Sequence, residues 1–230
     1  MPHIYAIGDL HLSHAVSNKA MDVFGSRWKD HADRLREAWQ ATVGADDLVL
    51  VPGDISWAMH LSEARADLEY LDALNGRKLL LRGNHDYWWQ SAAKLRAILP
   101  ESVSIVQNDA FCFGGYCICG TRGWVIPESN GFQESADRKI YERELGRLQL
   151  TLSRKDPDRI GIVMLHYPPF AENGVQSAFV TAIEEAGIRQ VVYGHLHGKS
   201  HRTAFEGSFH GVEYHLVSAD HLDFIPKRIV

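Results

Sequence analysis

Residues 78–86 read Lys-Leu-Leu-Leu-Arg-Gly-Asn-His-Asp, an apolar run that ends abruptly in a polar cluster containing a glycine. Continuous apolar runs of this length are typical of strands that are buried on both faces of a sheet. The same design recurs in four other segments, residues 3–11, 48–54, 160–169 and 190–197. The sequence therefore predicts a set of buried strands that each end in polar side chains.

Apolar side chains at helical spacing lie between these runs. The stripes cover Leu35–Val43, Ala64–Leu71, Trp88–Leu99, Tyr141–Leu152 and Phe179–Ala186. Residues 104–120 and 211–220 look instead like antiparallel strand pairs. Alternating strands and helices predict an α/β fold with helices packed on sheets. No linker, repeat or low-complexity segment divides the chain, so we expect one domain over residues 1–230.

The composition is that of a globular protein with enough apolar material for a core: 45% of residues are hydrophobic and 23% are charged. Lysine and arginine number 24 against 29 acidic residues, a net charge of −5, which argues against a general nucleic-acid or membrane-surface binder. No apolar run approaches the ~18 residues of a membrane span.

The cysteines favour a reducing compartment. Cys112, Cys117 and Cys119 are odd in number, and two of them lie two residues apart, on one face of a strand, where they cannot easily pair. The first residues, 1–4, lack the basic region of a signal peptide. We therefore expect a cytoplasmic location.

The polar clusters are expected to meet at one edge of the fold, because ligands of α/β sheets bind at the carboxyl ends of the strands. Asp9 and His11 are two residues apart, as are His195 and His197, so an extended backbone points both members of each pair to one side. The candidate metal ligands are Asp9, His11, Asp54, Asn84, His166, His195 and His197.

Seven nitrogen and oxygen donors exceed what one metal ion needs and suit two ions with a shared ligand. Asp54 stands alone at its strand end and is the natural bridging carboxylate. The lack of thiolate ligands disfavours a structural zinc site. It favours two divalent metal ions, with Mn²⁺ expected ahead of Fe, Zn²⁺ or Mg²⁺.

The five clusters together resemble the motifs of the calcineurin-like metallophosphoesterases. In chain order they are Gly8-Asp9-Leu10-His11, Gly53-Asp54, Gly83-Asn84-His85-Asp86, His166 and Gly194-His195-Leu196-His197. A looser similarity, through residues 120–124 and 218–220, points to a bacterial subgroup of small predicted phosphohydrolases. The resemblance implies a β-sandwich of two mixed sheets flanked by helices.

The resemblance also implies roles for the site residues. One ion would be held by Asp9, His11, Asp54 and His197, and the other by Asp54, Asn84, His166 and His195. His85 would be catalytic and protonate the leaving alkoxide. The implied reaction is attack on phosphorus by a hydroxide that bridges the two ions. We expect Asp86 to cap a helix over residues 87–99 instead of taking part in catalysis.

The substrate class is less determined by the motifs. We expect a small-molecule phosphoester and favour a nucleotide-like phosphodiester, with a phosphomonoester or a nucleotide pyrophosphate as the alternatives. A nuclease would need a basic groove, which the net charge does not favour. A catalytically silent binding scaffold typically loses ligands that are all present here.

Two residues of the long irregular segment 120–133 are candidates for substrate binding. The Arg122 guanidinium could hold a phosphate oxygen, and the Trp124 indole could stack on a base. A salt-bridged arginine and a packed tryptophan are the equally open alternative. For Arg82, just before the Gly-Asn-His-Asp cluster, we expect a structural ion pair.

Overall fold

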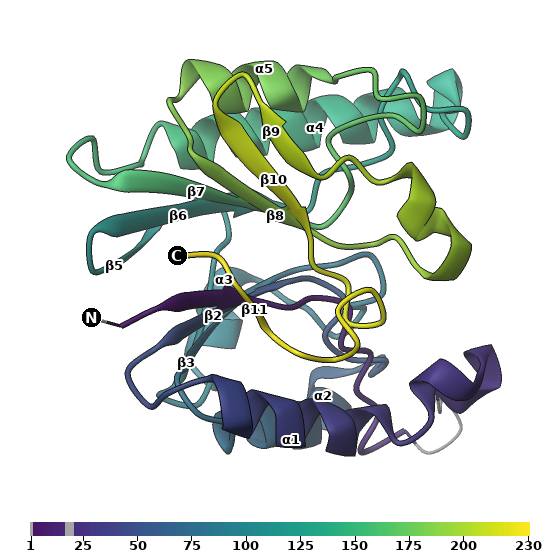
Figure 1. Ribbon diagram of the computed structural model, residues 1–230, viewed down its shortest axis with the longest axis vertical. Helices are drawn as coiled ribbons and strands as arrows, with labels where there is room; N and C mark the ends of the chain where they lie inside the picture. Colours follow the sequence, from purple (N-terminus) through teal and green to yellow (C-terminus); the bar gives the residue numbers. More distant parts are fainter. Residues whose placement is uncertain (1, 17–20) are drawn as a thin grey trace.

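The predicted strands form two sheets that face each other (Figure 1). The computed structural model describes residues 2–16 and 21–230; the single-domain prediction also includes Met1 and residues 17–20, which lie outside the described residues. The first sheet has the strand order β11-β1-β2-β3-β4. Its strands are β1 Ile4–Ala6, β2 Leu48–Pro52, β3 Arg77–Leu81, β4 Val103–Ile105 and β11 Lys227–Arg228.

The second sheet has the order β5-β6-β7-β8-β10-β9. Its strands are β5 Phe111–Phe113, β6 Tyr116–Thr121, β7 Ile160–Leu165, β8 Gln190–Tyr193, β9 Gly207–Phe209 and β10 Val212–Leu216. In both sheets the inner strands are parallel; one edge strand of the first sheet, β11, and both edge strands of the second, β5 and β9, are antiparallel. The sheets are therefore mixed, as the resemblance implies.

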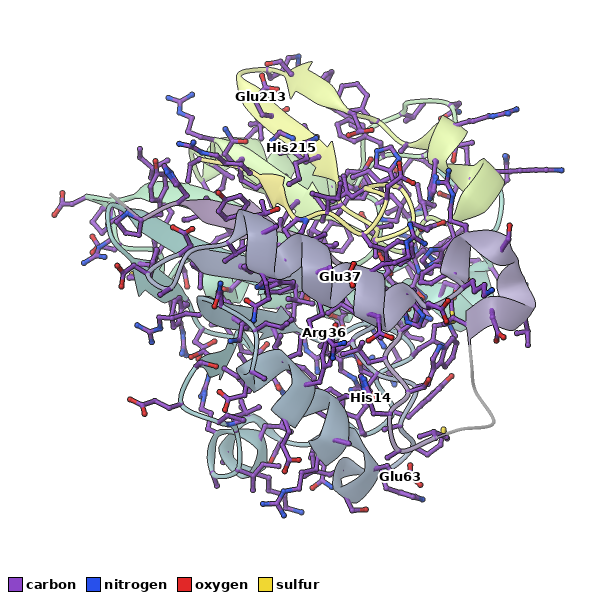
Figure 2. The ribbon with its side chains drawn as sticks, turned by 60° about the horizontal axis from the view of Figure 1, so that its bottom comes forward. His14, Arg36, Glu37, Glu63, Glu213 and His215 are labelled. Atoms are coloured by element: carbon purple, nitrogen blue, oxygen red, sulfur yellow. The ribbon has the colours of Figure 1, made fainter. Side chains whose placement is uncertain are left out.

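Helices cover the outer face of each sheet (Figure 1). The first sheet is covered by α1 His31–Thr42, α2 Leu61–Asp72 and the short α3 Ala92–Arg96, and the second by α4 Glu134–Leu152 and α5 Ala178–Glu185. On α1, Leu35 and Trp39 are buried, whereas Arg36 and Glu37 lie on the exposed face (Figure 2). This amphipathic division confirms the predicted α/β fold with helices packed on sheets.

The core has three apolar layers. One lies between the sheets, where Ile4 and Ala6 of β1 meet side chains such as Ile162 and Val192. The alternate residue Tyr5 packs in the layer under α1 and α2. A third layer fills the space between the second sheet and its helices. The strands are thus buried on both faces, which explains their continuous apolar runs.

Two predicted segments differ from the structure. Only β5 and β6 of residues 104–120 are antiparallel, because β4 joins the first sheet parallel to β3. Similarly, β10 pairs antiparallel with β9 and parallel with β8. Among the described residues, no helix combines the length and the hydropathy that crossing a membrane requires.

The helix predicted over residues 87–99 is also wrong in extent. Only Ala92–Arg96 is helical, and Ser91 is its N-cap, accepting a hydrogen bond from the Lys94 amide at 3.5 Å. Trp88 and Trp89 precede the helix and are buried. The Trp88 indole N–H donates to Asp86, and Asp86 bonds to two loops, so it cannot serve as the predicted cap.

Candidate metal centre

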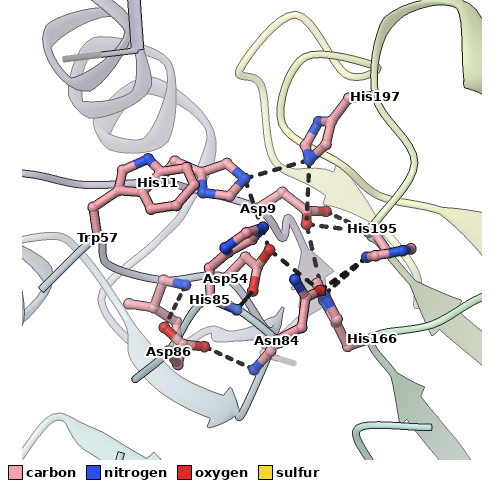
Figure 3. Close-up of polar contacts among 12 residues, drawn as sticks. Asp9, His11, Asp54, Trp57, Asn84, His85, Asp86, His166, His195 and His197 are labelled. Carbon is pink, nitrogen blue, oxygen red and sulfur yellow. Dashed lines mark hydrogen bonds and ion pairs between the residues drawn. The ribbon is translucent and has the colours of Figure 1, made fainter. Parts of the chain in front are cut away.

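All seven predicted ligands lie together where strands of both sheets end (Figure 3). From the first sheet, side chains follow β1, β2 and β3; from the second, they follow β7 and β8. Parallel strands present their carboxyl ends at one edge of a sheet, and here the corresponding edges of two facing sheets meet. The convergence that the sequence predicted is therefore a consequence of the sandwich.

One group of donors contains Asp9, His11 and His197, whose ligand atoms lie within 4.8 Å of one another. The Nε2 atoms of the two histidines are 3.3 Å apart. His197 Nε2 is 3.7 Å from Asp9 Oδ1. His11 Nε2 is 3.9 Å from Asp54 Oδ2.

A second group contains Asp9, Asp54 and His166. His166 Nε2 lies 3.6 Å from Asp54 Oδ2, 2.6 Å from Asn84 Oδ1 and 3.3 Å from His195 Nδ1. His195 Nδ1 is in turn 2.9 Å from Asn84 Oδ1. Asp9 belongs to both groups and Asp54 faces a histidine of each, so both carboxylates lie where a ligand shared by two ions would stand.

These distances fit divalent metal ions. A ring nitrogen carries at most one hydrogen, so His166 Nε2 cannot satisfy an amide oxygen, a carboxylate and a second ring nitrogen by hydrogen bonding. Ligand atoms that each lie ~2.0–2.2 Å from an ion stand ~3–3.5 Å from one another, close to the separations seen here. The donors are nitrogens and oxygens only, which suits ions of hard or borderline character.

The backbone at these ligands is unusual. Asp9, His11, Asp54 and His195 all have positive φ, with values of 54°, 46°, 51° and 73°. Left-handed backbone at a non-glycine residue is unfavourable and tends to occur at functional sites, where the surrounding structure holds it. Here the holding contacts include the amide of Asp9 donating to Gly53 O at 2.9 Å and that of His11 to Asp54 O at 3.0 Å.

The glycines of the motifs allow two carboxylates to approach the backbone. A Cβ at Gly83 would lie 2.1 Å from Asp54 Oδ1, and a Cβ at Gly194 would lie 2.2 Å from Asp9 Oδ2. Both separations are far below van der Waals contact. Glycine is therefore required at these two positions because any side chain would displace a metal-ligand candidate.

Three of the histidines are neutral at neutral pH and so can act as ligands. Burial, reinforced for His195 by His166, lowers the pKa of His166 and of His195 to about 3. Burial also lowers the pKa of His11 well below its ordinary value. The ring of His166 is oriented by Nδ1, which lies 3.0 Å from the Pro52 carbonyl oxygen, so Nε2 presents its lone pair to the site.

His197 behaves differently because it has an acidic partner outside the predicted set. Its Nδ1 lies 2.9 Å from Asp220 Oδ1. Burial opposes the charged ring, but the Asp220 hydrogen bond and the Asp9 charge outweigh it and raise the pKa of His197 to about 9. Carboxylates commonly orient ligand histidines in this way. Asp220 follows the end of β10, so the strand-end rule that located the other ligands would also have found it.

The two buried carboxylates need positive charge nearby. Asp9 and Asp54 are at most 1% exposed. Burial, together with the charge of Asp54, raises the pKa of Asp9 to about 7 despite the opposing effect of His197. Buried carboxylates are normally paired or bound to metal, and two cations at this centre would supply that charge.

His85 lies beside the ligands without joining either group. Its backbone amide donates to Asp54 Oδ1 at 2.8 Å, which fixes the loop against the shared carboxylate. Its ring centroid lies 4.5 Å from that of Trp57 and 5.9 Å from that of His11. The imidazole therefore faces the same space as the ligands, as a proton donor to a leaving group would need.

A cavity of about 510 Å³ opens onto this centre. Asp54, His85 and His197 form its floor, and Arg27, Trp28 and Trp57 are among its walls. Among the described residues that line it, Arg27 is the only arginine or lysine. Its guanidinium donates to the Asp220 carbonyl oxygen at 2.6 Å. Sequence analysis missed Arg27 and Trp28, because no strand-end motif marks the segment that carries them.

The two candidates for substrate binding lie elsewhere. Arg122 Nη2 is 3.7 Å from a Glu144 carboxylate oxygen, and its guanidinium carbon lies 4.6 Å from the Trp124 ring centroid. The Trp124 indole donates to Asp137 Oδ1 at 2.9 Å. Trp124 lines a neighbouring pocket of about 210 Å³ that His195 shares, whereas Arg122 does not line the cavity at the metal centre. Their roles in substrate binding stay predictions.

Comparison with known proteins identifies the family of the chain. The description "Calcineurin-like phosphoesterase" applies to the family that matches residues 2–199, so the chain belongs to that family.

Two curated relatives match part of the chain. They are the Gene 66 proteins of Mycobacterium phages D29, 38% identical over 89 residues, and L5, 36% identical over 90 residues. Each match covers 37% of this chain and 41% of the phage protein, so the chain spans less than half the length of these relatives.

Two solved structures share the fold. A protein of unknown function from Aquifex aeolicus has a TM-score of 0.56 and 16% identity, over 99% of this chain and 96% of its own. The phosphopantetheinyl hydrolase of Mycobacterium tuberculosis has a TM-score of 0.59 and 15% identity, over 100% and 96%. At this level of identity the likeness concerns the fold alone.

Proposed function

We propose that the chain binds two divalent metal ions and hydrolyses a small-molecule phosphodiester. The observation that supports a dinuclear site most directly is the position of Asp54, whose Oδ2 lies 3.9 Å from His11 Nε2 and 3.6 Å from His166 Nε2. Mn²⁺ is the ion we expect first, because the donor set combines carboxylates with imidazoles and contains no thiolate.

The ions, when bound, supply a nucleophile at neutral pH and neutralise the charge of the phosphoryl oxygens. The chain's own contribution is positioning and proton transfer. His85 lines the cavity beside the metal-ligand candidates and donates a proton to the leaving oxygen, a role typically contributing about 10²–10⁴-fold. Asp220 orients the His197 ring through Nδ1, so that Nε2 points into the site.

The cavity favours an anionic substrate with a planar group. Arg27 supplies a cation at the wall. Its side chain is about half exposed and its ion pair with Asp223 is long, at 3.8 Å, so an anion can compete for the guanidinium group. Trp28 and Trp57 provide aromatic surface beside it. A nucleotide-like phosphodiester combines these features; a phosphomonoester and a nucleotide pyrophosphate are the alternatives.

A reducing, cytoplasmic location is part of the proposal. All three cysteines are free, and the Sγ atoms of Cys112 and Cys117 lie 3.1 Å apart across β5 and β6 without a disulfide. Thiols held this close persist where the surroundings are reducing.

The test is hydrolysis of p-nitrophenyl phosphate and bis-p-nitrophenyl phosphate by metal-stripped protein, with and without added Mn²⁺. We expect Mn²⁺-dependent turnover with preference for the diester. Preference for the monoester would replace the diesterase assignment. Bound metal without turnover of either ester, or of a nucleotide and pyrophosphate panel, would support the silent scaffold instead.

A further inference from the structure

A second, smaller cavity of about 70 Å³ lies where β3 and β6 end against α4. Three arginines line it, Arg82, Arg122 and Arg147, together with one carboxylate, Glu144. A single water needs only ~10–15 Å³ by this kind of measure, so the cavity has room for a larger polar group. The described lining thus contains three guanidinium groups and one carboxylate.

Both carboxylate oxygens of Glu144 already accept hydrogen bonds from neighbouring side chains. Its side chain is 1% exposed, and its two oxygens accept hydrogen bonds from Arg147 Nη1 at 2.7 Å and from Thr121 Oγ1 at 2.6 Å. Arg122 Nη2 lies 3.7 Å from Glu144 Oε1, and Arg143 Nε lies 3.9 Å from the same oxygen. The single negative charge of Glu144 thus faces three arginines, and Arg147 is the nearest of them.

Arg82 has no counter-charge. In the described parts of the chain it forms neither a hydrogen bond nor an ion pair, so the structural ion pair expected from the sequence is wrong. The Nε atoms of Arg82 and Arg122 are both buried without a hydrogen-bond acceptor among the described residues. Buried cationic donors are costly unless they are paired, so an acceptor with negative charge is missing at this place.

A neutral donor completes the cavity. Gln107 Oε1 accepts a hydrogen bond from the Trp89 indole at 2.8 Å, which fixes the amide so that its NH₂ group remains available as a donor. Arginine forks and amide donors around a small cavity match the tetrahedral oxygens of a phosphoryl group.

We propose that Arg82, Arg122 and Arg147 form an oxyanion site, separate from the metal ligands, that binds a phosphoryl group. The group is either free inorganic phosphate or a second phosphate carried by the substrate. The site is coupled to the metal centre through the backbone, because the Arg122 carbonyl oxygen accepts hydrogen bonds from the His166 and Tyr167 amides at 3.1 and 2.9 Å. Arg82 is also two residues from Asn84.

The test is calorimetric titration of inorganic phosphate into the full-length chain, both stripped of metal and loaded with Mn²⁺. Arg82→Gln is the decisive variant, because Arg82 has no protein partner to lose among the described residues. Arg154→Gln is the matched control, because it removes the same charge from an exposed position on the far end of the α4 segment. Circular dichroism establishes that each form is folded.

We expect stripped wild-type protein and R154Q to bind one phosphate, and R82Q to bind it at least about tenfold more weakly. In the Mn²⁺-loaded form, R82Q should bind one phosphate fewer than the control. Phosphate should raise the melting temperature of wild type more than that of R82Q. Equal binding by R82Q and R154Q, or no phosphate bound by stripped wild type, overturns the proposal.

The source of the phosphoryl group is decided by kinetics on two phosphodiesters, adenosine 2′,3′-cyclic phosphate and the same compound carrying a 5′-phosphate. A loss of kcat/KM in R82Q confined to the 5′-phosphorylated diester identifies a substrate subsite, whereas unchanged kinetics with lost phosphate binding identifies a site for free phosphate. The calorimetric measurement of phosphate binding does not depend on the proposed function. A chain that binds phosphate through Arg82 but hydrolyses no ester would overturn that function and leave this site standing.

Discussion

Replacing Asp86 should destabilise the protein more than the loss of a typical helix N-cap residue would. This carboxylate is fully buried and accepts four hydrogen bonds. Oδ1 accepts from the Ile55 amide at 2.9 Å, the Ser56 amide at 3.2 Å and the Trp88 indole at 3.0 Å, and Oδ2 accepts from the Gly83 amide at 2.7 Å. It therefore ties the loop after β2 to the loop after β3, and each loop carries a metal-ligand candidate.

The magnitude follows from these four donors. A buried donor that loses its acceptor costs about 1–3 kcal/mol, and water entering the vacated space recovers part of that cost, so we expect Asp86→Ala to lower the free energy of unfolding by about 3–5 kcal/mol. Asp86→Asn should cost about 2 kcal/mol, because only the Gly83 amide then faces an NH₂ group. An N-cap role would cost only about 1 kcal/mol for the alanine variant and almost nothing for the asparagine variant, because asparagine caps a helix as well as aspartate does.

The assay is urea unfolding followed by circular dichroism. Burial and the nearby charge of Asp54 raise the pKa of Asp86 to about 7, so the measurement belongs at about pH 8, where the ionised form prevails. Asp46→Asn, at an exposed position, is the control. A loss of less than about 1 kcal/mol in the alanine variant would refute the reasoning.

Three further predictions concern the site and the core. Asp54→Asn should lose bound metal and nearly all turnover, because Oδ2 faces both ligand groups; metal analysis tests this, and full activity would count against a shared ligand. His85→Ala should keep its metal and slow hydrolysis about 10²–10⁴-fold for poor leaving groups but much less for p-nitrophenyl esters; equal losses would exclude a leaving-group acid. Burial lowers the pKa of Lys78 from 10.5 to about 8, so the folded state binds fewer protons than the unfolded state between these values. The stability of wild type relative to Lys78→Met should therefore rise with pH across that window, by up to about 3 kcal/mol, and urea unfolding that gives a constant difference between about pH 7 and about pH 10 would contradict it.

Much of the fold could be predicted because its strands are buried on both faces. The apolar runs that end at Ile7, Val51 and Leu165 correspond to β1, β2 and β7 within one or two residues. The pairing of the strands was harder to predict. Both β4 and β10 pair in parallel with strands that are distant in the sequence, and the local pattern of residues does not encode such pairs. The helix that contains α3 was predicted too long, because the tertiary contacts of Asp86 override the helical spacing of the residues directly after it.

The seven ligand candidates could be predicted because strand ends are adjacent to them in the sequence and parallel strands share an edge. Asp220 meets the same rule and lies in the segment 218–220 of the looser similarity, but the sequence alone assigned it no role at the metal centre. Arg27 and Trp28 belong to the 3₁₀ segment Ser26–Trp28, whose position over the cavity depends on packing against the chain's last residues. Arg122 could be singled out by type and loop, but its pairing with Glu144 comes from α4, far along the chain.

The central claim is that one constellation of seven side chains holds two ions that are both needed for turnover. The most direct measurement is Mn²⁺ titration of stripped protein, with binding and phosphoester hydrolysis followed in the same samples. Activity that rises to a plateau at two bound ions per chain is the result predicted here. Full turnover by the stripped protein, or a plateau at a single bound ion, would contradict the claim.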